Sequence, residues 1–238
     1  SRPSEAHGRE ICLVLSYCSG GDLFSWLERG ISGAIGVERE NAARPLMLKV
    51  VQAVRDIHLQ GVAHGDLSLE NILLEREVTD PALGEVRLID FGACSGRRAR
   101  GLRGKPSYQA PEVHTDQEYC AFTADAFSVG VMIFTLVVGN YPWRSTRPHV
   151  CQCWRFCAEK NLVAYLAKRK LKCGGGPEGP ERIVTLAELL SRELVDLLSG
   201  MFAVDPERRI GVAAALEHPW FARAAGPNGG SQASAQGS

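Results

Sequence analysis

The clearest hydrophobic pattern in the first third of the chain is helical. Apolar side chains recur at intervals of three, one, three and three, which keeps one face of a helix apolar. These positions are Met47, Val50, Val51, Val54 and Ile57. Gly61 ends the predicted helix, because glycine is favoured just beyond a helix C-terminus.

Shorter helices are predicted before and after this one. Asp22 is an N-cap residue type and begins a helix over residues 23–29. Three further helices are expected around residues 159–170, 186–201 and 211–216.

Strand patterns are few and short. Residues 11–17 (ICLVLSY) form a β-rich apolar run and are predicted as a strand. Residues 72–74 (ILL) and 85–89 (EVRLI) flank a turn at 81–84 and are expected to pair as a hairpin. The fold class is therefore mainly α (α+β), with short β-hairpins.

The longest apolar run covers residues 126–139 (AFSVGVMIFTLVVG), about 14 residues. A helix needs about 20 apolar residues to span a bilayer. We expect a helix buried in a protein core, and no membrane partner.

Two glycine-rich stretches are expected to stay irregular. Residues 174–180 (GGGPEGP) are predicted to form a flexible loop, and 224–238 a disordered tail with nothing to pack. The predicted organisation is a flexible N-terminus over 1–10, one domain over 11–222 and a disordered tail over 223–238.

Composition adds a constraint on partners. The chain has 238 residues, 27 basic and 27 acidic, and 45% of its residues are hydrophobic. This is ordinary for a globular protein. A net charge of zero gives no general attraction to nucleic acid, so no nucleic-acid partner is expected.

The eight cysteines indicate a reducing compartment. A chain of this length can bury a sizeable core and needs no disulfide staples, so free thiols are expected. We therefore predict an intracellular location, cytoplasmic or nuclear. The alternative is a zinc site on Cys151, Cys153, Cys157 and Cys173, although the chain has no CxxC pair there.

Three polar residues flank the predicted hairpin. Asp66 and Asn71 precede its first strand, and Asp90 follows its second. An antiparallel pair brings these two flanking segments to one edge, so the three side chains can converge. Carboxylate and amide oxygens suit a hard divalent cation, and the remaining carboxylate can accept a proton from a hydroxyl. These are the parts needed for phosphoryl transfer.

Six motifs in order along the chain resemble those of the protein kinase family. HGDLSLEN at 64–71 resembles the catalytic loop, DFG at 90–92 the metal-binding motif, and APE at 110–112 the end of the activation segment. DAFSVG at 125–130, DPERRI at 205–210 and LVLSYCSGGDL at 13–23 resemble the buried central helix, a late arginine segment and the hinge. The resemblance runs from about residue 13 to 221 and implies the C-terminal lobe of a Ser/Thr protein kinase.

The resemblance implies a role for each converging residue. Asp66 would accept the proton of a protein substrate's hydroxyl, Asn71 would hold one Mg²⁺, and Asp90 would hold the Mg²⁺ that bridges the phosphates. The implied cofactors are ATP and Mg²⁺, and the implied partner is a protein substrate.

The same resemblance implies an adenine site. Backbone groups of Ser16 and Cys18 would meet adenine, with Leu15 at the back of the pocket and Leu73 and Ile89 as its apolar floor. Asp22, at the end of the hinge segment, would border the nucleotide.

Supporting roles are also implied. Glu112 and Arg209 would form a structural ion pair, and His64 and Phe91 would pack together. Asp125 is expected both to cap its helix and to brace the catalytic loop.

The sequence departs from the family at several positions. Gly65 replaces the arginine that usually reads a phosphate on the activation segment, whose only hydroxyls here belong to Ser95, Ser107 and Tyr108. We therefore expect no phosphorylation switch in this segment. Ser68 replaces a lysine and Lys105 a threonine, and Lys105 is a candidate to restore the lost charge. The other basic residues of the segment are expected to form a solvated loop or, alternatively, to contact an acidic substrate.

The sequence has no glycine-rich loop and no strand lysine of the family's N-terminal lobe. We expect weak ATP binding and weak or no activity from this chain alone. The alternatives are a pseudokinase-like interaction or scaffold module and, third, a small-molecule kinase of similar fold.

Overall fold

The computed structural model describes residues 12, 14–30, 35–77, 84–173 and 182–222. Predictions for the N-terminus over 1–10, the loop at 174–180 and the tail over 223–238 lie outside the described residues, as does most of the 81–84 turn.

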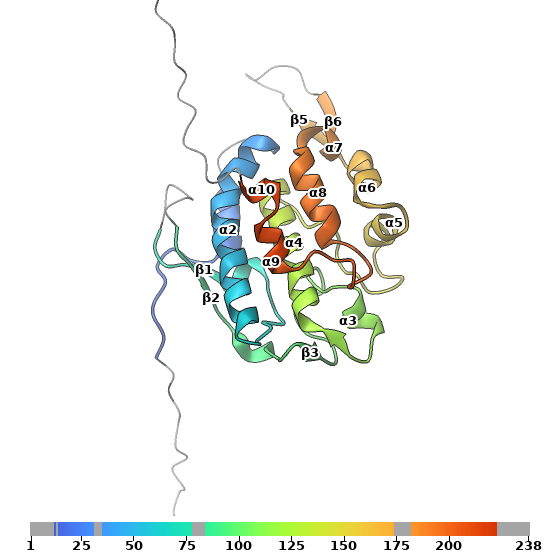
Figure 1. The fold of residues 1–238 in the computed structure, drawn as a ribbon. Coiled ribbons are helices and arrows are strands. Elements are labelled where there is room, and N and C mark those ends of the chain that lie inside the picture. The colour runs from blue at the N-terminus through green and yellow to red at the C-terminus, as the bar shows by residue number, and fades with distance from the viewer. Residues whose placement is uncertain (1–11, 13, 31–34, 78–83, 174–181, 223–238) are drawn as a thin grey trace, which may run out of the picture.

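Helices dominate the described chain, and the sheets are small (Figure 1). The α-helices are α1 (Leu23–Glu28), α2 (Val37–Leu59), α3 (Glu112–Thr115), α4 (Ala121–Val138), α5 (Gln152–Lys160), α6 (Leu162–Lys168), α7 (Leu186–Leu189), α8 (Arg192–Met201), α9 (Val212–Leu216) and α10 (Pro219–Ala222). Short 3₁₀ helices cover η1 (Leu69–Asn71) and η3 (Phe91–Ala93). The strands are β1 (Ile72–Leu74), β2 (Val86–Leu88), β3 (Arg98–Ala99), β4 (Tyr119–Cys120), β5 (Lys170–Cys173) and β6 (Arg182–Thr185).

The mainly helical α+β prediction agrees with this arrangement. In the described residues the strands pair only two by two, as β1–β2, β3–β4 and β5–β6, and each pair is antiparallel.

The two predicted long helices are confirmed and form the core. In α2 the predicted apolar face is fully buried at Met47, Val50 and Val54, and the helix packs against α4, α9 and β2. It ends before Gly61, whose φ of 80° is the left-handed conformation that glycine favours.

Helix α4 is the buried central helix and begins five residues earlier than predicted. Phe127, Met132 and Phe134 have no exposed surface. By length and composition alone α4 could cross a membrane, but 83% of its apolar window is buried inside the protein. That burial identifies a core helix.

The β1–β2 hairpin is confirmed and lies beside α2. Ile72 pairs with Leu88 and Leu74 with Val86. This register brings the residue before β1, Asn71, level with the residue after β2, Ile89. The hairpin therefore positions the two segments that carry the polar residues.

The predicted strand over 11–17 is wrong for the residues that the structure describes. Cys12 and the residues from Val14 to Cys18 form no strand, and their trace runs outside the helical body near the hairpin (Figure 1). Val14 and Tyr17 are 92% and 90% exposed. An isolated extended segment has no neighbour to satisfy its backbone hydrogen bonds, so its apolar composition does not produce a strand.

Other differences concern element boundaries. The predicted helix over 186–201 is two helices, because the Ser191 side chain caps a new helix by accepting from Leu194 N. The predicted helix over 159–170 shortens to α6 and is preceded by the unpredicted α5. The two-residue strands of β3–β4 and the β5–β6 pair were not predicted.

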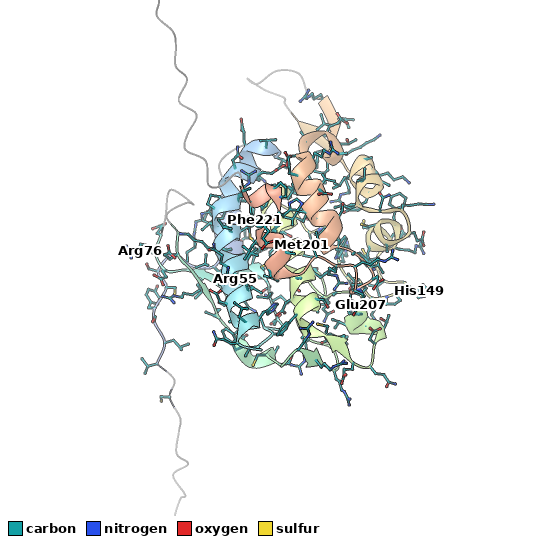
Figure 2. The ribbon with its side chains drawn as sticks, viewed as in Figure 1. Arg55, Arg76, His149, Met201, Glu207 and Phe221 are labelled. Atoms are coloured by element: carbon teal, nitrogen blue, oxygen red, sulfur yellow. The ribbon has the colours of Figure 1, made fainter. Side chains whose placement is uncertain are left out.

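A buried carboxylate ties the C-terminal helices to α2. Glu40 has no exposed surface and accepts hydrogen bonds from Ser191 N (2.7 Å), Ser191 Oγ (2.5 Å) and Trp220 Nε1 (3.0 Å). Phe221 and Met201 lie in the same helical region (Figure 2). These bonds fix α8 and α10 against the N-terminal end of α2.

Candidate active site

The loop between α2 and β1 carries Asp66, and a side chain of α4 binds the backbone of this loop. Asp125 of α4 is buried and accepts hydrogen bonds from His64 N (2.8 Å) and Gly65 N (3.0 Å). His58 Nε2 lies 2.9 Å from the same carboxylate. The predicted brace is confirmed. The predicted N-cap role is wrong, because α4 begins one turn earlier, with Cys120 as its N-cap.

Asp66, in the middle of this loop, and Asn71, at its end, are joined by a hydrogen bond. Asn71 Nδ2 donates to the backbone oxygen of Asp66 at 2.7 Å, which leaves the amide oxygen Oδ1 as its remaining acceptor. Asp66 Oδ1 is buried and has no hydrogen-bond partner among the described residues. A buried carboxylate oxygen without a donor is costly in a folded protein and points to an unfilled interaction.

The segment after β2 is hydrogen-bonded to the same loop. Ile89 N donates to Asn71 O at 3.0 Å, and Ile89 O lies 2.9 Å from His64 Nε2. Because Ile89 is bonded on both sides, the next residue, Asp90, stands beside the loop that carries Asp66.

Asp90 has a strained backbone at this position. Its φ and ψ of 62° and 71° are left-handed, an uncommon conformation for a residue other than glycine and one that clusters at functional sites. Its carboxylate is exposed, and Oδ1 accepts from Gly92 N at 3.2 Å. The second oxygen, Oδ2, remains available to a ligand.

The predicted packing of His64 against Phe91 is confirmed. Their rings lie 4.9 Å apart, and His64 is fully buried.

Two of the residues predicted to form an adenine floor lie at the hairpin. Leu73 and Ile89 are half-buried at the β1–β2 hairpin. Leu15 and Ser16 are not brought to this floor: both are exposed, and Leu15 is 72% exposed. Leu15 has little cover from the described residues, so its predicted place at the back of an adenine pocket stays a prediction. Cys18 is half-buried.

Asp22 joins the hinge segment to the hairpin. It forms a backbone bridge with Leu73 and caps α1, accepting from both the amide N and the hydroxyl of Ser25 at 2.8 Å. Partial burial raises the pKa of this carboxyl, but the Ser25 hydrogen bonds outweigh burial and lower the pKa below its ordinary value. Both carboxylate oxygens serve the helix cap, so the contact of Asp22 with a nucleotide stays a prediction.

Gly65 occupies a place that no larger residue fits. Its φ is 77°, and an added Cβ would lie 2.5 Å from Ala93 O. Arg103 lies beside it and donates from Nη1 to Ala93 O (2.6 Å) and Cys94 O (3.2 Å). An arginine of the activation segment thus holds the backbone that follows Asp90.

The two unusual residues Ser68 and Lys105 touch each other. Lys105 Nζ donates to Ser68 Oγ at 3.1 Å and forms an ion pair with Glu70 at 3.0 Å. The positive charge absent from position 68 is therefore supplied to the same loop from position 105.

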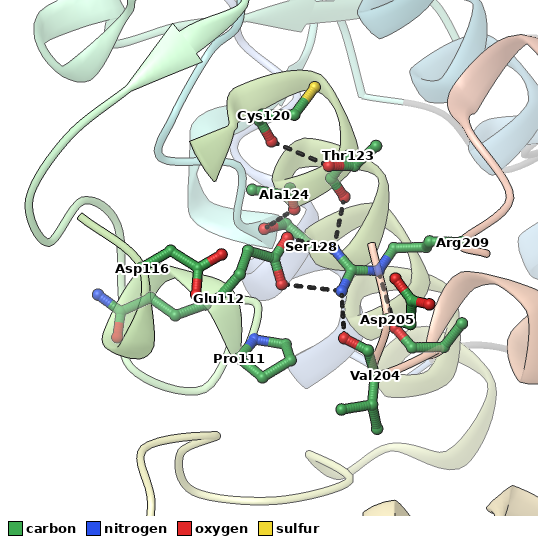
Figure 3. A network of polar contacts seen from close by, with 12 residues as sticks. Pro111, Glu112, Asp116, Cys120, Thr123, Ala124, Ser128, Val204, Asp205 and Arg209 are labelled. Atoms are coloured by element: carbon green, nitrogen blue, oxygen red, sulfur yellow. Dashed lines mark hydrogen bonds and ion pairs between the residues drawn. The ribbon is translucent and has the colours of Figure 1, made fainter. Parts of the chain in front are cut away.

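The predicted ion pair of Glu112 with Arg209 is confirmed (Figure 3). Both side chains are buried, and two parallel bonds of 2.5 and 2.8 Å join them. Arg209 also donates to the backbone oxygens of Thr123 and Ala203 at 3.0 Å. The pair links α3, the start of α4 and the loop before α9.

Sequence reasoning missed three supporting side chains. His58 stacks on Phe122 with ring centroids 4.2 Å apart, Arg103 holds the segment after Asp90, and Tyr108 OH accepts from Leu69 N at 3.3 Å. Their residue types are common, and their partners lie at least nine residues away in the chain. A sequence pattern alone gives no signal for such contacts.

The described cysteines support neither a disulfide nor a metal cluster. Cys12, Cys18, Cys94, Cys120, Cys151, Cys153 and Cys157 are free thiols. No group of three or more His, Cys, Asp or Glu residues within the described ranges is arranged to hold a metal ion. Burial raises the pKa of the Cys157 thiol to about 12, so this thiol is an inert core group.

The braced loop carries a buried carboxylate, Asp66, unpaired in the described chain, beside the amide of Asn71. A second carboxylate, Asp90, follows the short hairpin. This arrangement is typical of a kinase-type domain. Comparison with known families agrees, because the protein kinase domain family matches residues 4–221. The chain belongs to this family.

Several curated relatives are kinases from distant organisms. Over 221 residues the chain is 34% identical to maternal embryonic leucine zipper kinase of Xenopus tropicalis, covering 89% of this chain and 28% of the relative. It is 29% identical over 225 residues to CBL-interacting protein kinase 25 of Oryza sativa subsp. japonica, covering 92% and 38%. It is 30% identical over 216 residues to serine/threonine-protein kinase chk1 of Schizosaccharomyces pombe, covering 88% and 37%. The chain thus spans 28% to 38% of the length of these relatives.

Proposed function

We propose that this chain carries the catalytic machinery of a Ser/Thr protein kinase, which transfers the γ-phosphate of ATP to a hydroxyl of a protein. The observation that carries the proposal is the pair of hydrogen bonds that Ile89 forms through its backbone N and O. Its bonds to His64 and Asn71 hold the Asp90 segment beside the loop of Asp66.

Asp66 is the proposed general base. As the substrate oxygen bonds to the γ-phosphorus and ADP leaves, the hydroxyl proton passes to the Asp66 carboxylate. The unpaired, buried Oδ1 atom supports this role, because it has an acceptor site that nothing in the described chain fills. The Asp125 brace keeps the loop backbone fixed, so the carboxylate needs little reorganisation.

Asn71 and Asp90 are the proposed magnesium ligands. The bond from Asn71 Nδ2 to Asp66 O orients the amide so that its oxygen is free, and Asp90 keeps an unbonded oxygen. This oxygen-only donor set fits a hard divalent cation. Mg²⁺ held there would neutralise charge on the ATP phosphates.

Lys105 is proposed to add a positive charge beside the transferred phosphate. Its bond to Ser68 supports this, since Ser68 stands three residues before Asn71 in the catalytic loop. The ion pair with Glu70 keeps the ammonium group in place.

The proposed nucleotide floor consists of Leu73 and Ile89, with Leu15, Ser16, Cys18 and Asp22 as the hinge side. Because Leu15 and Ser16 are exposed, bound adenine would have an apolar floor and little cover. We therefore propose that the isolated chain binds ATP weakly and transfers phosphate slowly.

The substrate hydroxyls are proposed to be serine and threonine. The segment Tyr108-Gln109-Ala110-Pro111-Glu112 supports this class, and a relative that covers 88% of the chain carries serine/threonine in its name.

The free thiols support an intracellular, cytoplasmic or nuclear location, which fractionation of source cells would test.

A transfer assay tests the proposal. The full chain is incubated with γ-³²P-ATP, Mg²⁺ and a mixed protein substrate, and labelled phosphoamino acids are separated. We expect slow formation of phosphoserine and phosphothreonine. Asp66→Asn should lower the rate by about 10²–10⁴, because it removes the proton acceptor while keeping the side-chain shape.

The control is Asp56→Asn, which changes an exposed carboxylate on α2 paired with Arg55 and should leave the rate unchanged. Transfer that is indifferent to Asp66→Asn, or label only on tyrosine, would refute the proposal.

A second candidate is an interaction module of pseudokinase type. Its support is the exposed apolar side chains of Val14, Leu15 and Tyr17, an unusual grouping for a surface segment. Complete absence of label from every protein substrate in a folded sample would favour this candidate.

A further inference from the structure

A cleft of about 650 Å³ lies beside the activation segment and has no role in the proposed chemistry. Its walls come from Ser107, the connection over 140–144, the start of α5 and Arg169. This volume falls within the usual range of ligand clefts, about 300–1,000 Å³. It is large enough to receive several side chains of another molecule.

The charged residues that line the cleft are both basic. Arg144 and Arg169 are its only lining residues with a formal charge, and neither forms an ion pair with a carboxylate among the described residues. Arg169 lies over the Tyr165 ring at 5.6 Å, which holds its guanidinium near the cleft. An adjoining cavity that shares Arg169 adds Arg155 and Lys168 against a single acid, Glu159.

The start of α5 adds further hydrogen-bond donors to the same wall. Cys151 is the N-cap of this nine-residue helix and lines the cleft. Burial would raise the pKa of its thiol, but backbone N–H groups led by those of Trp154 and Arg144 outweigh burial and lower it. The wall therefore favours negative charge, as a helix N-terminus does.

Trp143 is a buried residue of the cleft lining whose N–H lacks an acceptor in the part of the chain that the structure describes. It lines the cleft and is 3% exposed, yet its indole N–H has no hydrogen-bond partner among the described residues. A buried indole N–H normally finds an acceptor. The nitrogen itself is buried, so a ligand in the cleft reaches it only if the Trp143 side chain shifts.

The cleft is connected to the catalytic loop by hydrogen bonds. Ser107 Oγ donates to Arg144 O at 3.1 Å, and Tyr141 OH lies 3.3 Å from Tyr108 OH. Tyr108 OH in turn accepts from Leu69 N, three residues after Asp66. A ligand in the cleft would thus be held at a fixed position relative to the proposed base.

We propose that this cleft binds acidic side chains of the protein substrate, so that aspartate and glutamate near the target hydroxyl determine specificity. The inference rests on the proposed kinase function and names its substrate class. Charge complementarity selects the occupant, because two arginines and a helix N-terminus face an otherwise neutral lining. Arg144 and Arg169 are the specificity-determining residues.

Peptide binding tests the proposal without any phosphate transfer. Fluorescence anisotropy of the full chain is measured with a labelled peptide that has one serine beside a run of glutamates, and with a matched glutamine peptide. We expect the glutamate peptide to bind at least about tenfold more tightly, with affinity falling as salt rises. Arg144→Gln and Arg169→Gln should each weaken its binding by about tenfold.

The matched control is Arg55→Gln. Arg55 is a partly exposed arginine on α2, away from the His149 side of the molecule where the cleft lies (Figure 2). It should leave the affinity unchanged, and Asp66→Asn should bind the peptide as the unmodified chain does. If transfer fails while this pattern holds, the kinase proposal is wrong and the cleft proposal stands.

Alkylation gives a second readout that needs no variant. Iodoacetamide labelling mapped by mass spectrometry should slow several-fold at Cys151 when the glutamate peptide is bound, and stay unchanged at the exposed Cys12. Equal affinities for the two peptides, unchanged binding by folded Arg144→Gln, or binding only of a serine-phosphorylated peptide would each overturn the proposal.

Discussion

Gly65 is one of the residues at which this chain departs from the kinase pattern, and its surroundings explain the departure. The left-handed backbone and the 2.5 Å approach to Ala93 O exclude a side chain there. Arg103 binds the oxygens of Ala93 and Cys94, so the segment after Asp90 is already fastened by a positive residue. The segment needs no phosphate to hold it.

The hydroxyls of the activation segment are poorly placed for modification. Ser95 Oγ is buried without a partner in the described chain, Ser107 Oγ donates to a backbone oxygen, and Tyr108 is 2% exposed. Burial also raises the pKa of Tyr108 far above its ordinary value, so its phenol stays protonated.

The first prediction is that phosphorylation of this segment does not control activity. Ser95→Ala combined with Ser107→Ala should change the rate of transfer to a substrate without acidic residues by less than about twofold, because neither hydroxyl forms a described hydrogen bond with Asp66 or Asn71. The measurement is the γ-³²P assay on phosphatase-treated protein. Loss of activity in a double variant with an unchanged melting temperature would contradict it.

Some site residues were predictable at this scale and others were not. The proximity of Asn71 to Asp66, and of the Asp90 segment to their loop, could be predicted because these residues flank strands of one hairpin at fixed spacing, whereas their roles stay predictions. Arg103 could not, since its partners are backbone oxygens that only the folded loop exposes. The exposure of Leu15 could not be predicted, since an apolar residue type does not reveal whether a neighbour exists to cover it.

The Glu112–Arg209 pair acts at the scale of elements. It joins α3, at the end of the activation segment, to α4 and to the loop before α9 (Figure 3). The activation segment is thereby fixed to the core helix that also braces Asp66 through Asp125.

The second prediction concerns the stability that this link provides. Arg209→Met should lower the free energy of unfolding by about 3–5 kcal/mol, because it leaves the Glu112 carboxylate buried without its partner. Adding Glu112→Leu to Arg209→Met should restore part of the loss, since no charge then remains buried. The measurement is urea denaturation followed by circular dichroism.

The neighbouring arginine is a matched control. Arg208 is 85% exposed and pairs with Asp205 at 3.5 Å, so Arg208→Met should cost less than about 1 kcal/mol. Equal costs for Arg208→Met and Arg209→Met would show that burial of the pair is not what matters.

The two longest helices were the most predictable elements. The patterns of α2 and α4 repeat over several turns and predicted both helices, whereas the two-residue strands β3 and β4 carry no periodicity at all. The division between α7 and α8 depends on Ser191, whose amide and hydroxyl bind Glu40 from 151 positions away. That partner could not be inferred from the local sequence.

At the scale of the whole molecule, we propose that one side of the helical body serves phosphate chemistry and another binds a partner peptide. The hairpin, Asp66, Asn71 and Asp90 form the first, and the cleft at Arg144 and Arg169 forms the second. The adjacent residues Ser107 and Tyr108 connect the two sides. Ser107 Oγ donates to Arg144 O at the cleft, and Tyr108 OH accepts from Leu69 N in the catalytic loop. The account therefore depends on whether the first side assembles a metal and nucleotide site.

Manganese binding in the presence of ATP tests that claim most directly. Mn²⁺ replaces Mg²⁺ as the probe, and electron paramagnetic resonance measures the Mn²⁺ bound by the full chain at millimolar ATP. The account predicts weak, saturable binding of Mn²⁺ with ATP. Asn71→Ala and Asp90→Ala should each weaken it by at least about tenfold, because each removes an oxygen ligand.

Asp56→Ala, which removes an exposed carboxylate from α2, should bind as the unmodified chain does. Binding that is unaffected by both Asn71→Ala and Asp90→Ala, in folded protein, would contradict the account.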